Sequence, residues 1–64
     1  MDTKKIGRFI ADARKKKKLT QAELGEYLNV TDKAVSKWEC GKCLPDSSLF
    51  EEMSKVLEVS MSEL

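Results

Sequence analysis

The fold of this chain is decided by residues 19–39, LTQAELGEYLNVTDKAVSKWE, where one helical pattern stops and another starts with hardly any room between them. Thr20 stands three residues before Glu23, which is the spacing of a capping box at the start of a helix. Thr31 lies between two valines at the spacing of a hydrophobic staple, so a second helix is expected to begin there. The stretch predicts a helix-turn-helix at about residues 20–40.

The turn between these helices is expected at Asn29, because asparagine tolerates positive φ better than any residue except glycine. Gly25 leaves space for the second helix to approach the first. Val30, Val35 and Trp38 have the spacing of inward-facing side chains, so Trp38 is expected in the core. The outer face of the second helix is then left with Asp32, Lys33, Ser36 and Lys37.

Further helices are expected on both sides of this pair. An apolar stripe at helical spacing precedes it, at Ile6, Phe9, Ile10 and Ala13. Gly41 and Pro45 end the second helix of the pair and leave a loop at about 41–46. The next helix is expected to be capped by Asp46, Ser47 or Ser48. Its apolar stripe consists of Leu49, Phe50, Met53, Val56 and Leu57. Ser60 and Glu63 have capping-box spacing, so a fifth helix is expected near residue 60.

This pattern predicts an all-α, compact five-helix domain covering residues 1–64. A core of this size buries only about 60% of the unfolded surface, and histidine is absent, so we do not expect an enzyme. No apolar run approaches the roughly 18 residues of a membrane span, and the N-terminus lacks a signal-peptide pattern. The chain is expected to be cytoplasmic.

The charge is unevenly distributed, although the net charge is only +1. Residues 1–20 carry eight Lys or Arg against two Asp, a net +6. Residues 44–64 carry one Lys against one Asp and four Glu, a net −4. The basic part includes Lys15 to Lys18, which are typical of a solvated helix end and also suit phosphate contact. Such polarity fits a molecule that turns one face to a polyanion.

The chain contains, in this order, LTQAELGEYLNVT, AVSKWE, Gly41, Pro45, Leu49 and VLEVSMSEL. Their order and spacing resemble those of the Cro/repressor-type helix-turn-helix domains, also called the xenobiotic-response-element family. The resemblance covers nearly the whole chain and implies a lambda-repressor-like fold with helix three in the DNA major groove. It implies sequence-specific double-stranded DNA binding by a bacterial or phage transcriptional regulator, most simply a repressor. It further implies a homodimer on a near-palindromic operator, without a cofactor.

Site residues follow from the same resemblance, position by position. Gln21 matches a glutamine that contacts phosphate and braces the first recognition residue. Thr31 and Lys42 match flanking backbone contacts, and the residues matching base-edge or nearby phosphate contacts are Asp32, Lys33, Ser36 and Lys37. Arg14 and Glu39 match positions that form an ion pair between helices one and three.

Three departures from the family pattern bear on affinity. Asn29 replaces a common glycine, Gly25 replaces a common alanine, and the loop after helix three is less basic than usual. Fewer phosphate contacts in that loop would leave affinity modest or dependent on Lys17 and Lys18. The chain ends one turn into the predicted fifth helix, so it is open whether it is the N-terminal part of a longer regulator.

Two alternatives stay open at this point. The same motif could dock onto a protein, as in an antitoxin-type interaction module, because fold alone does not decide function. Cys40 and Cys43 form a C-x-x-C pair, which we interpret as two reduced cytosolic thiols, with a redox switch or adventitious disulfide as alternatives. A closed zinc site would need additional ligands from carboxylates or another chain.

Overall fold

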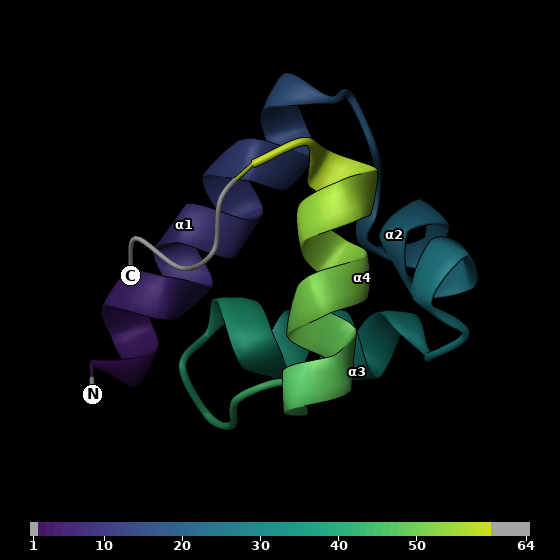
Figure 1. The fold of residues 1–64 in the computed structure, drawn as a ribbon. Helices are drawn as coiled ribbons and strands as arrows, with labels where there is room; N and C mark the ends of the chain where they lie inside the picture. Colours follow the sequence, from purple (N-terminus) through teal and green to yellow (C-terminus); the bar gives the residue numbers. More distant parts are fainter. Residues whose placement is uncertain (1, 60–64) are drawn as a thin grey trace.

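The computed structural model describes residues 2–59, and the regular structure in that range is entirely helical. The helices are α1 (Thr3–Lys16), α2 (Gln21–Leu28), α3 (Asp32–Glu39) and α4 (Ser47–Leu57) (Figure 1). The predicted all-α architecture is confirmed for these residues, and the fifth helix expected near residue 60 lies outside them. None of the four described helices is long and apolar enough to cross a membrane.

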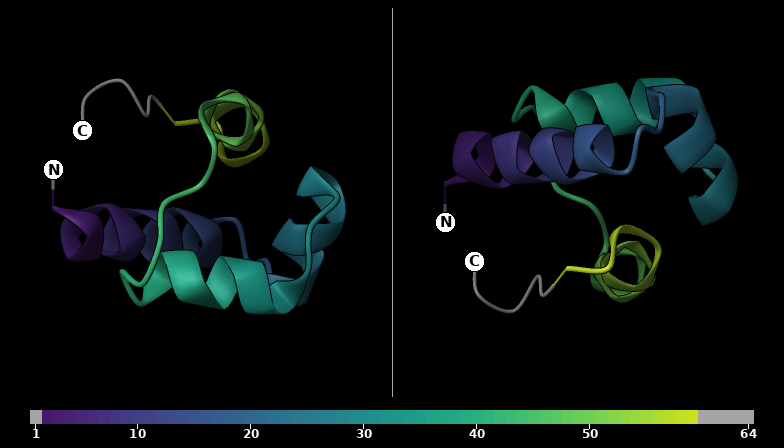
Figure 2. Two further views of the ribbon diagram at one scale, coloured as in Figure 1. Left: turned by 90° about the horizontal axis from the view of Figure 1, so that it is seen from below. Right: turned by 90° about the horizontal axis from the view of Figure 1, so that it is seen from above.

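All four helices enclose one hydrophobic core. In both views of Figure 2, α1 and α3 lie side by side, α2 lies at one end, and α4 is seen end-on as it crosses on the opposite side from α3. Each helix supplies a side chain with 0% exposure, namely Ile10, Leu24, Val35 and Met53 in chain order. The apolar stripes predicted from the sequence therefore meet in one place, and α3 keeps an outer face away from α4.

The starts of α2 and α3 are fixed by the predicted threonine caps. The Thr20 hydroxyl accepts from the backbone N–H of Glu23 at 3.0 Å, and the Glu23 carboxylate accepts from the N–H of Thr20 at 2.9 Å. The Thr31 hydroxyl accepts from the N–H of Ala34 at 3.2 Å. Such caps contribute about 1 kcal/mol each. Asp46 occupies the N-cap position of α4 without a side-chain hydrogen bond, so only its place in the sequence was predicted correctly.

Each described helix is terminated by a residue in the left-handed conformation. These residues are Lys18, Asn29, Gly41 and Glu58, with φ of 58°, 59°, 76° and 54°. Asn29 is the predicted one between α2 and α3, where the N–H of Val30 donates back to the carbonyl of Gly25 at 2.8 Å. This return bond satisfies a carbonyl that the helix end would leave unpaired. The sharp turn is thus built from Asn29.

Gly25 is required by the same turn. A Cβ at this position would lie 2.7 Å from the carbonyl oxygen of Val30 and 3.2 Å from the carbonyl carbon of Thr31. The space predicted at Gly25 is therefore occupied by the backbone leading into α3.

Candidate nucleic-acid interface

The outer face of α3 is polar and accessible, as the helical spacing predicts. Asp32, Lys33 and Lys37 are exposed and Ser36 is half-buried. On the inner face, Val35 is fully buried and Trp38 is 5% exposed, so the prediction that Trp38 belongs to the core is confirmed. The inner side chains hold α3 against the core and leave its outer side chains available to a partner.

The flanking positions Thr31 and Lys42 are also exposed. The Thr31 oxygen is used in the cap of α3, but its hydroxyl hydrogen remains a possible donor to a phosphate. Lys42 follows Gly41, and its N–H donates to the carbonyl of Lys37 at 2.9 Å, which holds the loop against the end of α3. These two residues therefore lie at opposite ends of α3.

The orientation of α3 is set by a hydrogen-bonded cluster beneath it. Arg14 donates through Nε to Glu39 Oε2 at 2.7 Å and through a terminal nitrogen to Glu39 Oε1 at 3.1 Å. Its other terminal nitrogen donates to the carbonyl of Leu19 at 2.7 Å. The ion pair expected from the resemblance is confirmed, and it ties the end of α1 to the last residue of α3, while the bond to Leu19 holds the segment that precedes α2.

This ion pair is largely removed from water. The side chains of Arg14 and Glu39 are 12% and 8% exposed. The hydrogen bond to Glu39 raises the pKa of Arg14 above its ordinary value, against the smaller opposing effect of desolvation, and the Glu39 charge adds to the rise. Arg14 therefore carries its charge in a largely buried ion pair and has a structural role.

Gln21 belongs to the same cluster, which the sequence did not indicate. Its side-chain amide donates to Glu39 Oε1 at 3.0 Å, and the residue is half-buried. The resemblance had implied that Gln21 braces the first recognition residue. Its observed partner, Glu39, lies at the other end of α3, because the start of α2 packs beside the Arg14–Glu39 pair.

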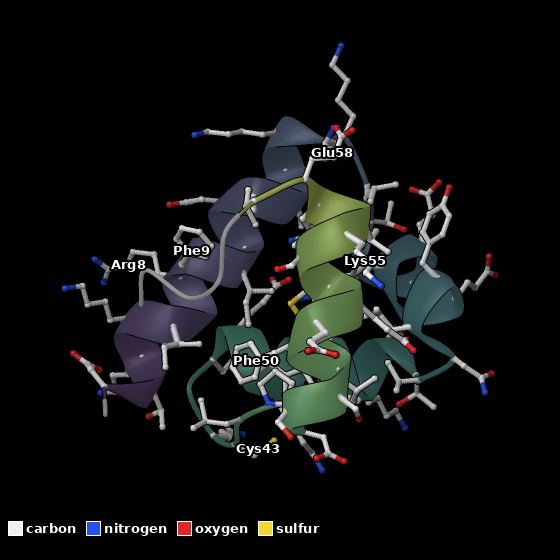
Figure 3. All side chains as sticks on the ribbon, viewed as in Figure 1. Arg8, Phe9, Cys43, Phe50, Lys55 and Glu58 are labelled. Atoms are coloured by element: carbon white, nitrogen blue, oxygen red, sulfur yellow. The ribbon has the colours of Figure 1, made fainter. Side chains whose placement is uncertain are left out.

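The basic residues that end α1 divide into two groups. Lys15, Lys16 and Lys18 are exposed, whereas Lys17 forms an ion pair with Glu58 at the end of α4. Glu58 is labelled at that end of α4 in Figure 3. Both partners are substantially exposed, so the pair adds at most about 1 kcal/mol. Part of the Lys17 charge is nevertheless offset by an acid from the negatively charged C-terminal part.

Comparison with known proteins supplies the family. The family model HTH_3, described as helix-turn-helix, matches residues 10–64. The chain belongs to this helix-turn-helix family. The fold of this HTH_3 domain is similar to that of the P22 c2 repressor protein, solved in complex with synthetic operator 9T, with a TM-score of 0.82 and 36% identity. The similarity covers 86% of this chain and 83% of that one.

Similar full-length proteins are considerably longer than this HTH_3 domain. It is 37% identical over 60 residues to Repressor protein C2 of Salmonella phage P22, covering 94% of this chain and 28% of that protein. It is 44% identical over 48 residues to the HTH-type transcriptional activator BcrR of Enterococcus faecalis, covering 75% and 24%. It is 32% identical over 56 residues to Multiprotein-bridging factor 1 of Candida albicans, covering 88% and 37%. The Cro/repressor-type resemblance is confirmed.

Proposed function

We propose that this HTH_3 domain is the sequence-specific double-stranded DNA-binding domain of a transcriptional regulator, most simply a bacterial or phage repressor. The observation that carries the proposal is α3, whose buried face is fixed by the core and by the Arg14–Glu39 pair while its polar face is open. The fold similarity to a repressor solved with its operator supports the same function.

In this proposal α3 enters the major groove. Lys33 and Lys37 lie one helical turn apart on its exposed side, where each can donate to guanine O6 and N7. Asp32 can accept from cytosine N4, and Ser36 can donate or accept. Three residues outside the base-reading face of α3 contact the phosphate backbone, namely Gln21, Thr31 and Lys42. Gln21 does so with the part of its amide that the bond to Glu39 leaves free.

Charge orients the domain on DNA. The net +6 of residues 1–20 includes the run Lys15 to Lys18 at the end of α1, just before the start of α2, whereas residues 44–64 carry a net −4. In the described structure α4 crosses on the side away from α3, so this helix lies apart from the proposed contact face (Figure 2). The basic end of α1 then attracts phosphate, although the Lys17–Glu58 pair reduces that contribution.

A near-palindromic operator bound by a homodimer completes the proposal. One α3 of eight residues reads only a few base pairs, so two copies are needed to specify a site, with half-sites about 34 Å apart. Selection of binding sites from a random duplex library tests both statements. We expect one enriched motif with an inverted repeat. Enrichment of no motif would contradict specific binding, and a single asymmetric motif would contradict the dimer.

A protein-interaction module is the second candidate function. The net −4 of residues 44–64 suits a basic protein partner, and similarity to multiprotein-bridging factors points in the same direction. In that case the outer face of α3 would bind protein. A gel shift on random duplex at low salt separates the candidates, because sequence-independent phosphate contacts alone give measurable binding under those conditions.

Lys33 and Lys37 provide the residue-level prediction. We expect Lys33→Ala to weaken operator binding by about 1 to 3 kcal/mol and to relax preference at one base pair, because a lysine at a guanine is lost. Lys37→Ala should have the same effect if Lys37 contacts a base. If Lys37 contacts a phosphate, its loss should weaken binding to all sequences alike and lower the slope of log affinity against log salt concentration by about one. The measurement is affinity for operator and scrambled duplex across a salt series.

Lys55→Ala is the matched control for this series. Lys55 is exposed on α4 (Figure 3), and α4 crosses on the opposite side from α3 (Figure 2). Its removal takes away the same charge without touching the proposed interface, so operator affinity should change little. If neither α3 variant weakens operator binding relative to Lys55→Ala, α3 is not the recognition helix and the protein-interaction function becomes the better proposal.

A further inference from the structure

The end of α3 carries two cysteines that the proposed DNA contacts do not use. Cys40 and Cys43 flank Gly41 and Lys42, where α3 ends and the loop to α4 begins. Both are free thiols, and both are exposed. Cys43 is labelled at the outer edge of the molecule in Figure 3. Two accessible thiols separated by two residues are a pair that oxidation can link, provided that the backbone between them can bring the sulfurs together.

The backbone holds these two cysteines differently. The N–H of Cys40 donates to the carbonyl of Ser36 at 2.9 Å, so Cys40 is anchored to the last turn of α3. Cys43 lies in the loop before α4, outside any helix. Gly41, with φ of 76°, turns the chain between them. A disulfide needs Cα atoms about 4.4–6.8 Å apart, so closure depends on where the loop places Cys43 relative to the anchored Cys40.

We propose that Cys40 and Cys43 are a redox-sensitive dithiol, which closes into an intramolecular disulfide around Lys42 and weakens DNA binding. The DNA-binding consequence rests on the proposed function, whereas disulfide formation does not. With hydrogen peroxide as oxidant, one cysteine loses its proton, and the thiolate attacks a peroxide oxygen to give a sulfenic acid and hydroxide, which that proton converts to water. The second cysteine displaces the sulfenic oxygen as a second water, so two thiols lose two electrons and peroxide gains two.

Lys42 connects this chemistry to DNA. In the reduced protein its N–H is bonded to the carbonyl of Lys37, which sets where its side chain leaves the loop beside α3. The disulfide closes a ring that contains Gly41 and Lys42, and we expect this constraint on the Lys42 backbone to move its ammonium group from the phosphate that we assign to it. Loss of one phosphate contact should lower affinity roughly three- to tenfold and reduce the salt slope by about one.

Treatment of the reduced chain with hydrogen peroxide tests the chemistry without DNA. We expect intact-mass loss of two hydrogens, disappearance of both free thiols, a linked peptide containing both cysteines, and reversal by dithiothreitol. Cys40→Ser and Cys43→Ser should each prevent the mass loss, and both positions are exposed, so the variants should fold. The proposal is overturned if the treated chain contains no intramolecular disulfide, for example if its products are intermolecular dimers or over-oxidised single cysteines.

Operator titrations of the reduced and oxidised chain test the consequence. We expect the oxidised wild type to bind more weakly, with the lower salt slope, and the double variant Cys40→Ser/Cys43→Ser to bind equally before and after peroxide. Lys42→Ala should bind weakly in both states. Equal binding by both wild-type states would overturn the regulatory inference. If the reduced chain binds no duplex at all, the proposed function fails, while the mass measurement still decides disulfide formation.

Discussion

Arg14→Ala and Glu39→Ala should each lower the free energy of unfolding by about 3 to 5 kcal/mol, because each leaves a charged partner buried without its counterion. Arg14→Ala leaves the Glu39 carboxylate, which is 8% exposed, with the Gln21 amide as its one remaining side-chain partner among residues 2–59. Glu39→Ala leaves the Arg14 guanidinium, which is 12% exposed, with the carbonyl of Leu19 as its one acceptor in the described part of the chain. The net stabilisation that the ion pair contributes is smaller than this destabilisation, because burying the two charges also costs desolvation free energy.

Thermal and urea unfolding measure this effect. In a domain of this size each kcal/mol shifts the midpoint by about 4 to 8 °C, so both midpoints should fall by well over ten degrees. Lys15→Ala is the control, because Lys15 is exposed beside Arg14 and its loss should stay within about 0.5 kcal/mol. The double variant Arg14→Met/Glu39→Leu should recover much of the loss. Unchanged midpoints in both single variants would show that the pair contributes nothing.

The same variants separate stability from DNA contact. Because the pair fixes α3 and does not face outward, Arg14→Ala should retain operator affinity at temperatures where it is folded. A DNA-contacting arginine would instead lose affinity with little change in the unfolding midpoint.

Local signals allowed the sequence to predict most of the fold. Thr20 and Thr31 act through hydrogen bonds to N–H groups three residues away, and Asn29 and Gly41 act through their own φ, so a few neighbouring residues contain the information. The buried stripes follow from helical period alone. The exposure of the outer face of α3 could be predicted in the same way, because this face lies opposite the buried stripe that contains Val35 and Trp38.

Contacts between helices could not be predicted in this way. The Arg14–Glu39 pair was expected only through family resemblance, and the partner of Gln21 was unexpected, because both depend on how α1, α2 and α3 cross. The ion pair of Lys17 with Glu58 likewise joins residues far apart in the chain. The assignment of bases to Lys33 or Lys37 depends on the geometry of a complex and remains a proposal.

Gly7 shows most clearly how helix crossing overrides local preference. It lies inside α1, where replacing glycine with alanine ordinarily stabilises a helix by about 1 kcal/mol. A Cβ at this position, however, would lie 2.3 Å from the carbonyl oxygen of Trp38 and 2.7 Å from that of Glu39. Both atoms belong to backbone, which cannot rotate away as a flexible side chain can. The close packing of α1 on α3 therefore requires a residue without a side chain.

Gly7→Ala should consequently destabilise the domain by about 3 kcal/mol or more, because α1 must move away from α3 and so disturb the Arg14–Glu39 pair. Urea unfolding of Gly7→Ala measures the loss. Arg8→Ala is the control at the next position, where the exposed side chain points away from the other helices (Figure 3) and the change should stay within about 0.5 kcal/mol. If Gly7→Ala is as stable as the wild type or more stable, helix propensity outweighs the contact, and α1 and α3 do not cross as closely as described.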